Sequence, residues 1–370
     1  MSVCEPCLRR SYLIAHLAPR IAGLLDRPRE RPSGLLELAE EELIERVTRG
    51  ERADAAHEFL RTFDADRALG ELVDADIGAV CRHAAQYPPA LHGLTDPPSV
   101  LYGTGSADRV AQLTAAPAAT IVGTRRPSPY GTEIARELGR GLAAAGVTVI
   151  SGLALGIDAL AHQGTLAGRG RPIAVLACGA NLAYPTRHRE LYKRVREAGI
   201  VLSELPPGCR PFRWSFPARN RIMAALGAIT VVVEAADPSG SLITASFAAD
   251  LGTTVGAVPG QVTSRVAAGS NRLLRDGAAT IRCTEDVLDE MFGIGNGPSG
   301  RRDAAPPPAL ALEPRLRTVL DGVEVGEGVG EIAARTGMSA PAVRSALGEL
   351  ELEGLIVAGG VGWYQRAASG

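Results

Sequence analysis

Continuous apolar runs alternate with amphipathic segments through the middle of the chain. The runs occupy residues 119–123, 147–152, 172–178, 200–204, 229–235 and 253–260. Each is followed by a helix-like segment of roughly 10–15 residues. Because the runs are continuous rather than alternating, we expect strands that are covered on both faces. The pattern predicts an α/β fold with a doubly wound parallel sheet over residues 86–292.

The two flanks have different patterns. Residues 1–85 show short helical segments separated by polar turns, which predicts a small helical accessory domain. Residues 293–311 are rich in Gly, Pro and Ala and predict a flexible linker. Residues 312–370 show helix, tight turn, helix and two short strands, the pattern of a winged helix. Ser339 is the expected N-cap after the turn.

Composition limits the class of protein. The chain has 370 residues, of which 46% are hydrophobic and 22% charged, so a disordered or fibrous chain is excluded. No stretch of about 18 uncharged apolar residues occurs, and the N-terminus lacks a secretory signal pattern. We therefore expect a cytoplasmic protein without a membrane partner. Net charge is −2, yet residues 95–292 carry 20 basic and 16 acidic side chains, so any nucleic acid should bind there.

Cysteine spacing gives little support for metal chemistry. Six cysteines are scattered along the chain: Cys4, Cys7, Cys81, Cys178, Cys209 and Cys283. Only the first two form a CxxC pair, and no second close pair completes a zinc site. The expectation is reduced thiols in a cytoplasmic protein, with no metal and no cofactor.

The first candidate binding segment is the turn that follows the strand ending at residue 122. Gly123 and Thr124 permit close backbone approach, and the following helix offers free N–H groups near Ser128. Arg125 adds a two-pronged phosphate donor. The segment matches neither GxGxxG nor GxxxxGK[ST], so a single phosphate fits better than a dinucleotide or triphosphate. A purely structural turn is the alternative.

A second Gly-rich turn contains Gly152 and Gly156. Asp158 and His162 follow it four residues apart, so they share one helix face. They could form an acid/base pair. The alternative is a hydrogen bond that braces the turn, which is favoured because no serine or cysteine nucleophile is evident beside them.

The segment 209–221 is the most informative. It contains four arginines, no acid, and the three rings of Phe212, Trp214 and Phe216, in a chain that is only 4% aromatic. Guanidinium groups can neutralise phosphates, while rings stack on unpaired bases with about 1–3 kcal/mol per base. Duplex bases are already stacked, so the pattern favours single strands. The alternative is core aromatics beside a solvated arginine face.

Further turns occur at later strand ends. Gly240, Ser241 and Thr244 open a helix after the strand that ends near Glu234. Residues 258–260 and 269–271 add turn chemistry at another strand end. Together the turns predict a phosphate-binding rim on one edge of the sheet.

From about Tyr87 to Met291 this ordered series of motifs resembles the DprA/Smf family of DNA-processing proteins of natural transformation. Motifs that carry the resemblance include residues 101–103, 123–131, 151–162, 178–179, 184–185, 203–204, 216–221, 234–245, 259–260 and 269–271. The resemblance implies an extended Rossmann core that binds single-stranded DNA, loads the RecA recombinase on it and acts as a homodimer. It implies DNA contacts at Arg213, Phe216, Arg219 and Arg221, and a phosphate-binding turn at Gly123 and Arg125.

The full set of candidate DNA- or phosphate-binding residues is Gly123, Thr124, Arg125, Ser128, Gly152, Gly156, Arg213, Phe216, Arg219, Asn220, Arg221, Gly240, Ser241 and Thr244.

Two other functions fit the sequence less well. Phosphoribohydrolase-like Rossmann enzymes use a PGGxGTxxE turn whose Glu acts on the ribosyl bond. Here residues 239–244 occupy that turn and the first acid after it is Asp250, so we expect no catalytic residue and no enzyme. A duplex-reading regulator is disfavoured because residues 341–354, the second helix of the predicted winged helix, carry one Arg and three Glu. That helix is expected to have a protein-contact or regulatory role, and weak DNA contact is the lesser alternative.

Overall fold

The computed structural model describes residues 2–25, 33–297, 313–352, 355–360 and 363–366. The chain divides into two compact units, Met1–Gly300 and Arg301–Gly370. No helix among the described residues is long and apolar enough to cross a membrane.

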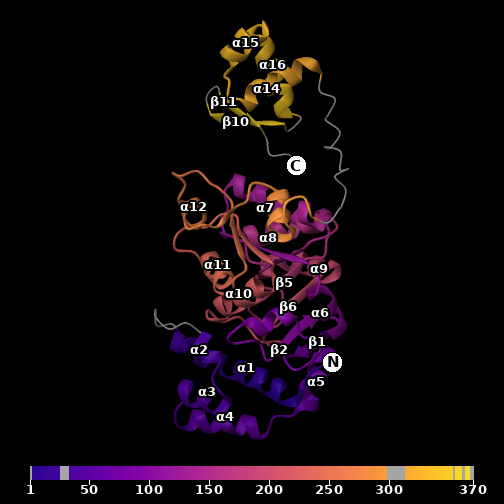
Figure 1. Cartoon of the computed structure of the whole chain (residues 1–370), viewed down its shortest axis with the longest axis vertical. Coiled ribbons are helices and arrows are strands. Elements are labelled where there is room, and N and C mark those ends of the chain that lie inside the picture. Colours follow the sequence, from indigo (N-terminus) through magenta and orange to yellow (C-terminus); the bar gives the residue numbers. More distant parts are fainter. Residues whose placement is uncertain (1, 26–32, 298–312, 353–354, 361–362, 367–370) are drawn as a thin grey trace. The chain divides into compact units, whose positions relative to one another are not determined.

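A nine-stranded sheet forms the centre of the first unit (Figure 1). Its strands lie in the order β1-β2-β6-β5-β4-β3-β7-β8-β9. All neighbours from β6 to β9 pair in parallel, whereas β2 is antiparallel to both β1 and β6. The bounds are β1 Ile77–Cys81, β2 Val100–Thr104, β3 Ala118–Val122, β4 Thr148–Ser151, β5 Ile173–Val175, β6 Ile200–Ser203, β7 Ile229–Val232, β8 Thr254–Ala257 and β9 Ala279–Thr280.

Helices cover both faces of this sheet, as the continuous apolar runs predict. Neighbouring residues of β4 show the arrangement: Ile150 packs with α10 and α11, and Val149 packs with α7 and α8. The helices after β2 are α6 Ala107–Thr114, α7 Pro129–Ala144, α8 Ile157–Ala167, α9 Arg189–Ala198, α10 Ser215–Leu226, α11 Gly240–Asp250, α12 Ala268–Arg275 and α13 Thr284–Phe292. Short 3-10 turns lie at Pro89–Gly93, Thr186–His188 and Arg265–Ala267. The predicted doubly wound α/β core is confirmed.

The N-terminal helices form their own small core next to the β1–β2 end of the sheet (Figure 1). They are α1 Glu5–Leu25, α2 Ser33–Leu36, α3 Glu40–Val47, α4 Glu51–Arg61 and α5 Ala65–Asp74. Trp214 from the segment before α10 joins this core and donates from its indole N–H to the Ala18 carbonyl at 3.1 Å. The helical segment is therefore packed onto the sheet domain rather than separated from it.

The structure departs from the predicted boundary at residue 85. Strand β1 lies within residues 1–85, which we expected to be wholly helical, and it forms the edge of the central sheet. Ser2 also bridges to Val80 beside it. The strand is a run of only five buried residues between a helix and a turn. Such a short run has no hydrophobic periodicity that distinguishes a strand from the end of a helix.

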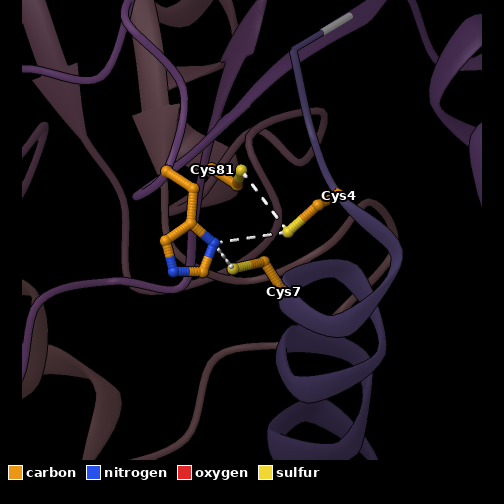
Figure 2. A group of neighbouring side chains, drawn as sticks. Cys4, Cys7 and Cys81 are labelled. Carbon is orange, nitrogen blue, oxygen red and sulfur yellow. Dashed lines mark hydrogen bonds between the residues drawn. The ribbon is translucent and has the colours of Figure 1, made fainter.

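A second departure concerns the CxxC pair. Cys4 and Cys7 lie at the start of α1, next to Cys81 at the end of β1 and to His83 two residues later (Figure 2). The sequence shows no second close pair to complete a zinc site, but the fold brings Cys81 and His83 beside the first pair. The missing partners come from a Cys-x-His arrangement, which a search for a second CxxC does not find.

The second unit is the predicted winged helix. It contains α14 Pro314–Glu324, α15 Val329–Thr336, α16 Ala340–Leu352 and the antiparallel strands β10 Ile356–Gly360 and β11 Trp363–Arg366. Gly337 ends α15 in the left-handed conformation, with φ +71°. Ser339 accepts from the Ala342 N–H and so starts α16 as expected.

Candidate nucleic-acid interface

The candidate site lies where the order of strands reverses. From β3 the chain continues outward through β4, β5 and β6, and then returns to the other side of β3 to form β7 and β8. In open α/β sheets this point, beyond the carboxyl ends of the strands, is where ligands bind. A pocket of about 250 Å³ lies here, lined by residues after β3 and by the start of α11. Eight of the predicted residues line it: Gly123, Arg125, Phe216, Arg219, Asn220, Gly240, Ser241 and Thr244.

Glycines allow the loops around the pocket to pack closely. A side chain at Gly123 would meet Ile157 and the Glu234 carbonyl oxygen, and one at Gly152 would overlap the Arg219 guanidinium. Gly156 has φ +80° and lies against the backbone of Thr124. Gly152, Gly156 and Thr124 therefore shape the loops and do not line the pocket themselves.

Arg125, Phe216 and Tyr184 form a cluster beside the pocket, in which Arg125 and Tyr184 are exposed and Phe216 is half-buried. The Arg125 guanidinium lies over the Phe216 ring, with its central carbon 5.7 Å from the ring centroid. Phe216 in turn contacts Tyr184, with ring centroids 5.8 Å apart and planes tilted by 53°. No acid among the described residues lies within ion-pair distance of Arg125, whose side chain is exposed. An exposed cation, the exposed Tyr184 ring and the half-buried Phe216 ring thus lie together beside the pocket.

Tyr184 is a site residue that sequence analysis quoted only as part of a motif. Its side chain is 41% exposed, and it follows β5, far from Phe216 in the sequence. The signal that could have identified it is the rarity of aromatic residues together with its position after a buried strand.

The start of α7 is already occupied by a carboxylate of the protein itself. The Glu234 carboxylate accepts from the Ser128 N–H at 2.9 Å and from the Ser128 hydroxyl at 2.5 Å. The same hydroxyl caps α7 by accepting from the Gly131 N–H. Ser128 therefore braces the turn from Gly123 and does not offer its hydroxyl to a phosphate, contrary to the prediction.

The start of α11 is open. A side chain at Gly240 would meet no atom within 4 Å, and Ser239 caps the helix. The Thr244 hydroxyl is buried, lines the pocket and has no hydrogen-bond partner among the described residues. Asn220 donates to the Gly240 carbonyl at 3.3 Å and so ties this helix start to α10. Because Ser239 accepts from the Ser241 and Leu242 N–H groups, this start offers an anion the unpartnered Thr244 hydroxyl and the positive end of the helix dipole.

Two of the predicted arginines are structural. Arg221 is 2% exposed and pairs with Asp96 at 2.8 Å and with Glu204 at 2.7 Å. Burial opposes its charge, but the two carboxylates more than offset this, so the pKa of Arg221 is raised. Its predicted DNA contact is wrong, because the whole guanidinium is used inside the protein.

Arg219 has an intermediate position. It is 5% exposed and lines the pocket floor, while it donates to the carbonyls of Gly152, at 2.8 Å, and Val175. It therefore holds the Gly152 loop in place and puts a positive charge beneath the pocket, rather than reaching out to a ligand.

The remaining residues of segment 209–221 divide between surface and core. Arg213 is exposed on the loop before α10, whereas Trp214 is buried and Phe212 half-buried in the N-terminal helical core. Of the three rings predicted to stack on bases, only Phe216 lines the pocket, and its stacking stays a prediction. The alternative of core aromatics applies to the other two.

The Asp158–His162 pair does not form an acid/base dyad. Asp158 accepts from the N–H groups of Gly152, at 3.1 Å, and Ala154, at 3.4 Å. Burial raises the pKa of Asp158, while Arg219 and these N–H groups oppose the rise. His162 is fully buried, and burial lowers its pKa to about 3. The bracing alternative holds.

The last predicted turn is braced internally. The Asn271 side chain accepts from the Gly260 N–H and donates to the Gly260 carbonyl, both at 3.0 Å. Tyr130 donates to the Pro259 carbonyl at 3.0 Å. This turn does not line the pocket.

Comparison with known proteins adds to this geometry. The sequence profile of the DNA recombination-mediator protein A family matches residues 78–292, and that of the DprA winged helix domain matches residues 302–360. The chain belongs to the DNA recombination-mediator protein A (DprA) family. Protein Smf of Synechocystis sp. is 34% identical over 300 residues, which cover 73% of this chain and 75% of that protein.

Two solved DprA structures resemble this chain. DprA of Streptococcus pneumoniae has a TM-score of 0.61 at 28% identity, over 79% of this chain and 99% of that one. DNA processing protein A of Helicobacter pylori has a TM-score of 0.51 at 30% identity, over 57% of this chain and 93% of that one. The structural work on the latter concerns its single-stranded DNA binding mode. The DprA fold is therefore shared over the sheet domain that holds the pocket.

Proposed function

We propose that this DprA-family protein binds single-stranded DNA across the carboxyl edge of its sheet. The single observation that carries the proposal is the Arg125–Phe216–Tyr184 cluster, of which Arg125 and Phe216 line the pocket of the switch point and Tyr184 contacts Phe216. The guanidinium would pair with a phosphate while a base stacks on a ring. The pocket is smaller than the roughly 300–1,000 Å³ that encloses drug-sized ligands, which suits one phosphate or base of a longer polymer.

The site should prefer unpaired over duplex DNA. Stacking on Phe216 or Tyr184 requires a base whose face is free, and a duplex offers such a face only at its ends. The basic side chains beside the rings bind either form through phosphates. The rings therefore supply the discrimination, and the arginines supply affinity that falls with salt.

The proposal is tested by fluorescence anisotropy with single-stranded and duplex oligonucleotides across a salt series. Phe216→Ala should weaken single-strand binding by about 1–3 kcal/mol, roughly 5- to 150-fold, with little effect on duplex binding. Arg125→Ala should weaken binding and reduce the slope of log K against log salt by about 0.7. Arg140→Ala is the matched control, since Arg140 lies near the far end of α7 and pairs with Glu137. Full affinity in both site variants, with folding intact, would contradict the proposal.

The family resemblance supports two finer proposals, that the protein loads RecA on the bound strand and that it acts as a homodimer. Neither surface has a sequence motif. The test is whether the full chain speeds RecA filament formation on protein-coated single strands, and whether its mass in solution is twice that of one chain. A monomeric protein without effect on RecA filaments would contradict both proposals. The DNA-binding proposal would not be affected, because the anisotropy titration tests it separately.

We propose that the chain acts without catalysis. The first acid after the Ser239 turn is Asp250, at the far end of α11 and outside the pocket. Asp158 does line the pocket, but its carboxylate accepts from the Gly152 and Ala154 N–H groups. A phosphoribohydrolase would need a carboxylate within reach of the ribosyl bond. Release of free base from nucleoside monophosphates by the purified protein would contradict this.

The winged helix is proposed to contact protein rather than read duplex DNA. Glu349 of α16 pairs with Arg315 at 2.7 Å, and Glu351 of the same helix is exposed. Acidic groups on this helix repel phosphates.

A further inference from the structure

Three thiols and an imidazole gather where the start of the chain meets the edge of the sheet. Four potential ligand atoms lie within 4.8 Å of one another, and they come from Cys4, Cys7, Cys81 and His83 (Figure 2). Among the described residues, no other group of three or more His, Cys, Asp or Glu side chains is arranged in this way. We propose that these four residues bind one zinc ion.

The distances within the cluster fit a tetrahedral ion. The Nδ1 atom of His83 lies 3.4 Å from the sulfurs of both Cys4 and Cys7, and the sulfurs of Cys4 and Cys81 are 3.8 Å apart. Zinc bonds of about 2.3 Å to sulfur and 2.0–2.1 Å to nitrogen at the tetrahedral angle place two sulfurs about 3.8 Å apart and sulfur and nitrogen about 3.5 Å apart. Three of the six separations match these edges and all six lie within 4.8 Å, so small side-chain rotations would bring the four ligands to an ion.

A disulfide explains the cluster less well. Bonded sulfurs lie about 2.05 Å apart, far closer than the 3.8 Å between Cys4 and Cys81. A disulfide would also leave the third cysteine and His83 without a part in the arrangement. Three thiolates and one imidazole are one of the common ligand sets of structural zinc sites. Four protein ligands leave no open position, so the ion would be structural and not catalytic.

The surroundings suit a bound metal. Cys4 precedes α1 and Cys7 lies in its first turn, where the helix dipole favours thiolates. Arg10 and Arg82 lie close enough to Cys7 to offset part of the negative charge of a site with three thiolates. His83 is exposed while Cys7 and Cys81 are buried, so solvent reaches the cluster from the histidine side.

The zinc site would fasten α1 to the edge of the central sheet. Its ligands join the first turn of α1 to the end of β1, and so close a loop that contains all five N-terminal helices. Farther along α1, the Ala18 carbonyl accepts from Trp214 in the segment that leads to Phe216. By fixing α1 to the sheet, the metal would also stabilise the segment that leads to Phe216, which lines the pocket.

The first test is the metal content of the full chain, purified under reducing conditions without a histidine tag. We expect one zinc per chain by mass spectrometry, and none in the Cys4→Ser/Cys81→Ser double variant. Cys283→Ser is the matched control, because Cys283 is an exposed free cysteine outside the cluster, and it should keep one zinc. His83→Ala should lose zinc to a weak chelator, and His83→Cys should retain it.

A second measurement decides the matter if the double variant fails to fold. Wild-type protein exchanged into Co²⁺ should show the intense visible bands and thiolate charge transfer of tetrahedral, sulfur-rich cobalt, and chelation of zinc should lower its Tm. The proposal is overturned if wild-type protein holds no zinc as purified and takes up none when reduced. It is also overturned if the double variant retains full zinc.

Discussion

At the scale of single residues, burial decides which arginines can reach a ligand. Arg125 is exposed and rests on Phe216, whereas Arg221 is enclosed by Asp96 and Glu204. Removing one member of such a buried set leaves a charge unpaired, at a cost of about 3–5 kcal/mol. The sequence places Arg213, Arg219 and Arg221 in one basic segment, but it does not show which of them point inward. Loss of DNA binding in an Arg221 variant would therefore report misfolding rather than a lost contact.

His162 gives a prediction about acid stability. Burial lowers its pKa to about 3, while the unfolded chain binds a proton near pH 6.5. Between these values the unfolded state binds more protons, so stability is lost as pH falls below about 6.5, by about 1.4 kcal/mol per unit. We expect the free energy of unfolding of His162→Leu to fall less than that of wild type between pH 7 and pH 5. Parallel pH profiles in urea denaturation would contradict this.

At the scale of elements, two helix starts that look alike in sequence differ in whether they are free to bind an anion. The start of α7 is closed by the Glu234 carboxylate, and the start of α11 is open to the pocket. Both follow a buried strand and a Gly- and Ser-containing turn, so the sequence pattern predicts a phosphate site at each. The pattern does not show that Glu234, at the end of β7, reaches across to the turn after β3.

The two helix starts yield a paired prediction. Gly240→Asp should fold normally, because a side chain there has open space, yet its carboxylate should repel a bound phosphate by about 1–4 kcal/mol. Gly131→Ala should instead lower Tm, because its Cβ would overlap the Glu234 carboxylate. Thermal unfolding and single-strand affinity measured on both variants separate the effects. Equal DNA affinity in Gly240→Asp and wild type at low salt would show that α11 does not face the strand.

At the scale of the whole molecule, the sequence predicted the elements that have a clear hydrophobic pattern. All six apolar runs of the core are strands, and the winged helix has its expected elements. The sequence did not predict β1, β2 or β9, which are short or pair outside the parallel core. Contacts between distant segments were also missed, such as Tyr184 against Phe216 and Cys81 beside Cys4. Such contacts depend on how loops meet at a sheet edge, which periodicity does not encode.

The central claim is that unpaired DNA lies across the pocket at the switch point. The most direct measurement is photo-cross-linking of the full chain to single strands that contain photoreactive thymidines, followed by mass spectrometry of the peptides. The claim predicts cross-links in the peptides that contain Tyr184 and Phe216, lost on competition with unlabelled single strands but not with duplex. Cross-links confined to residues 5–74 or to the winged helix would contradict it.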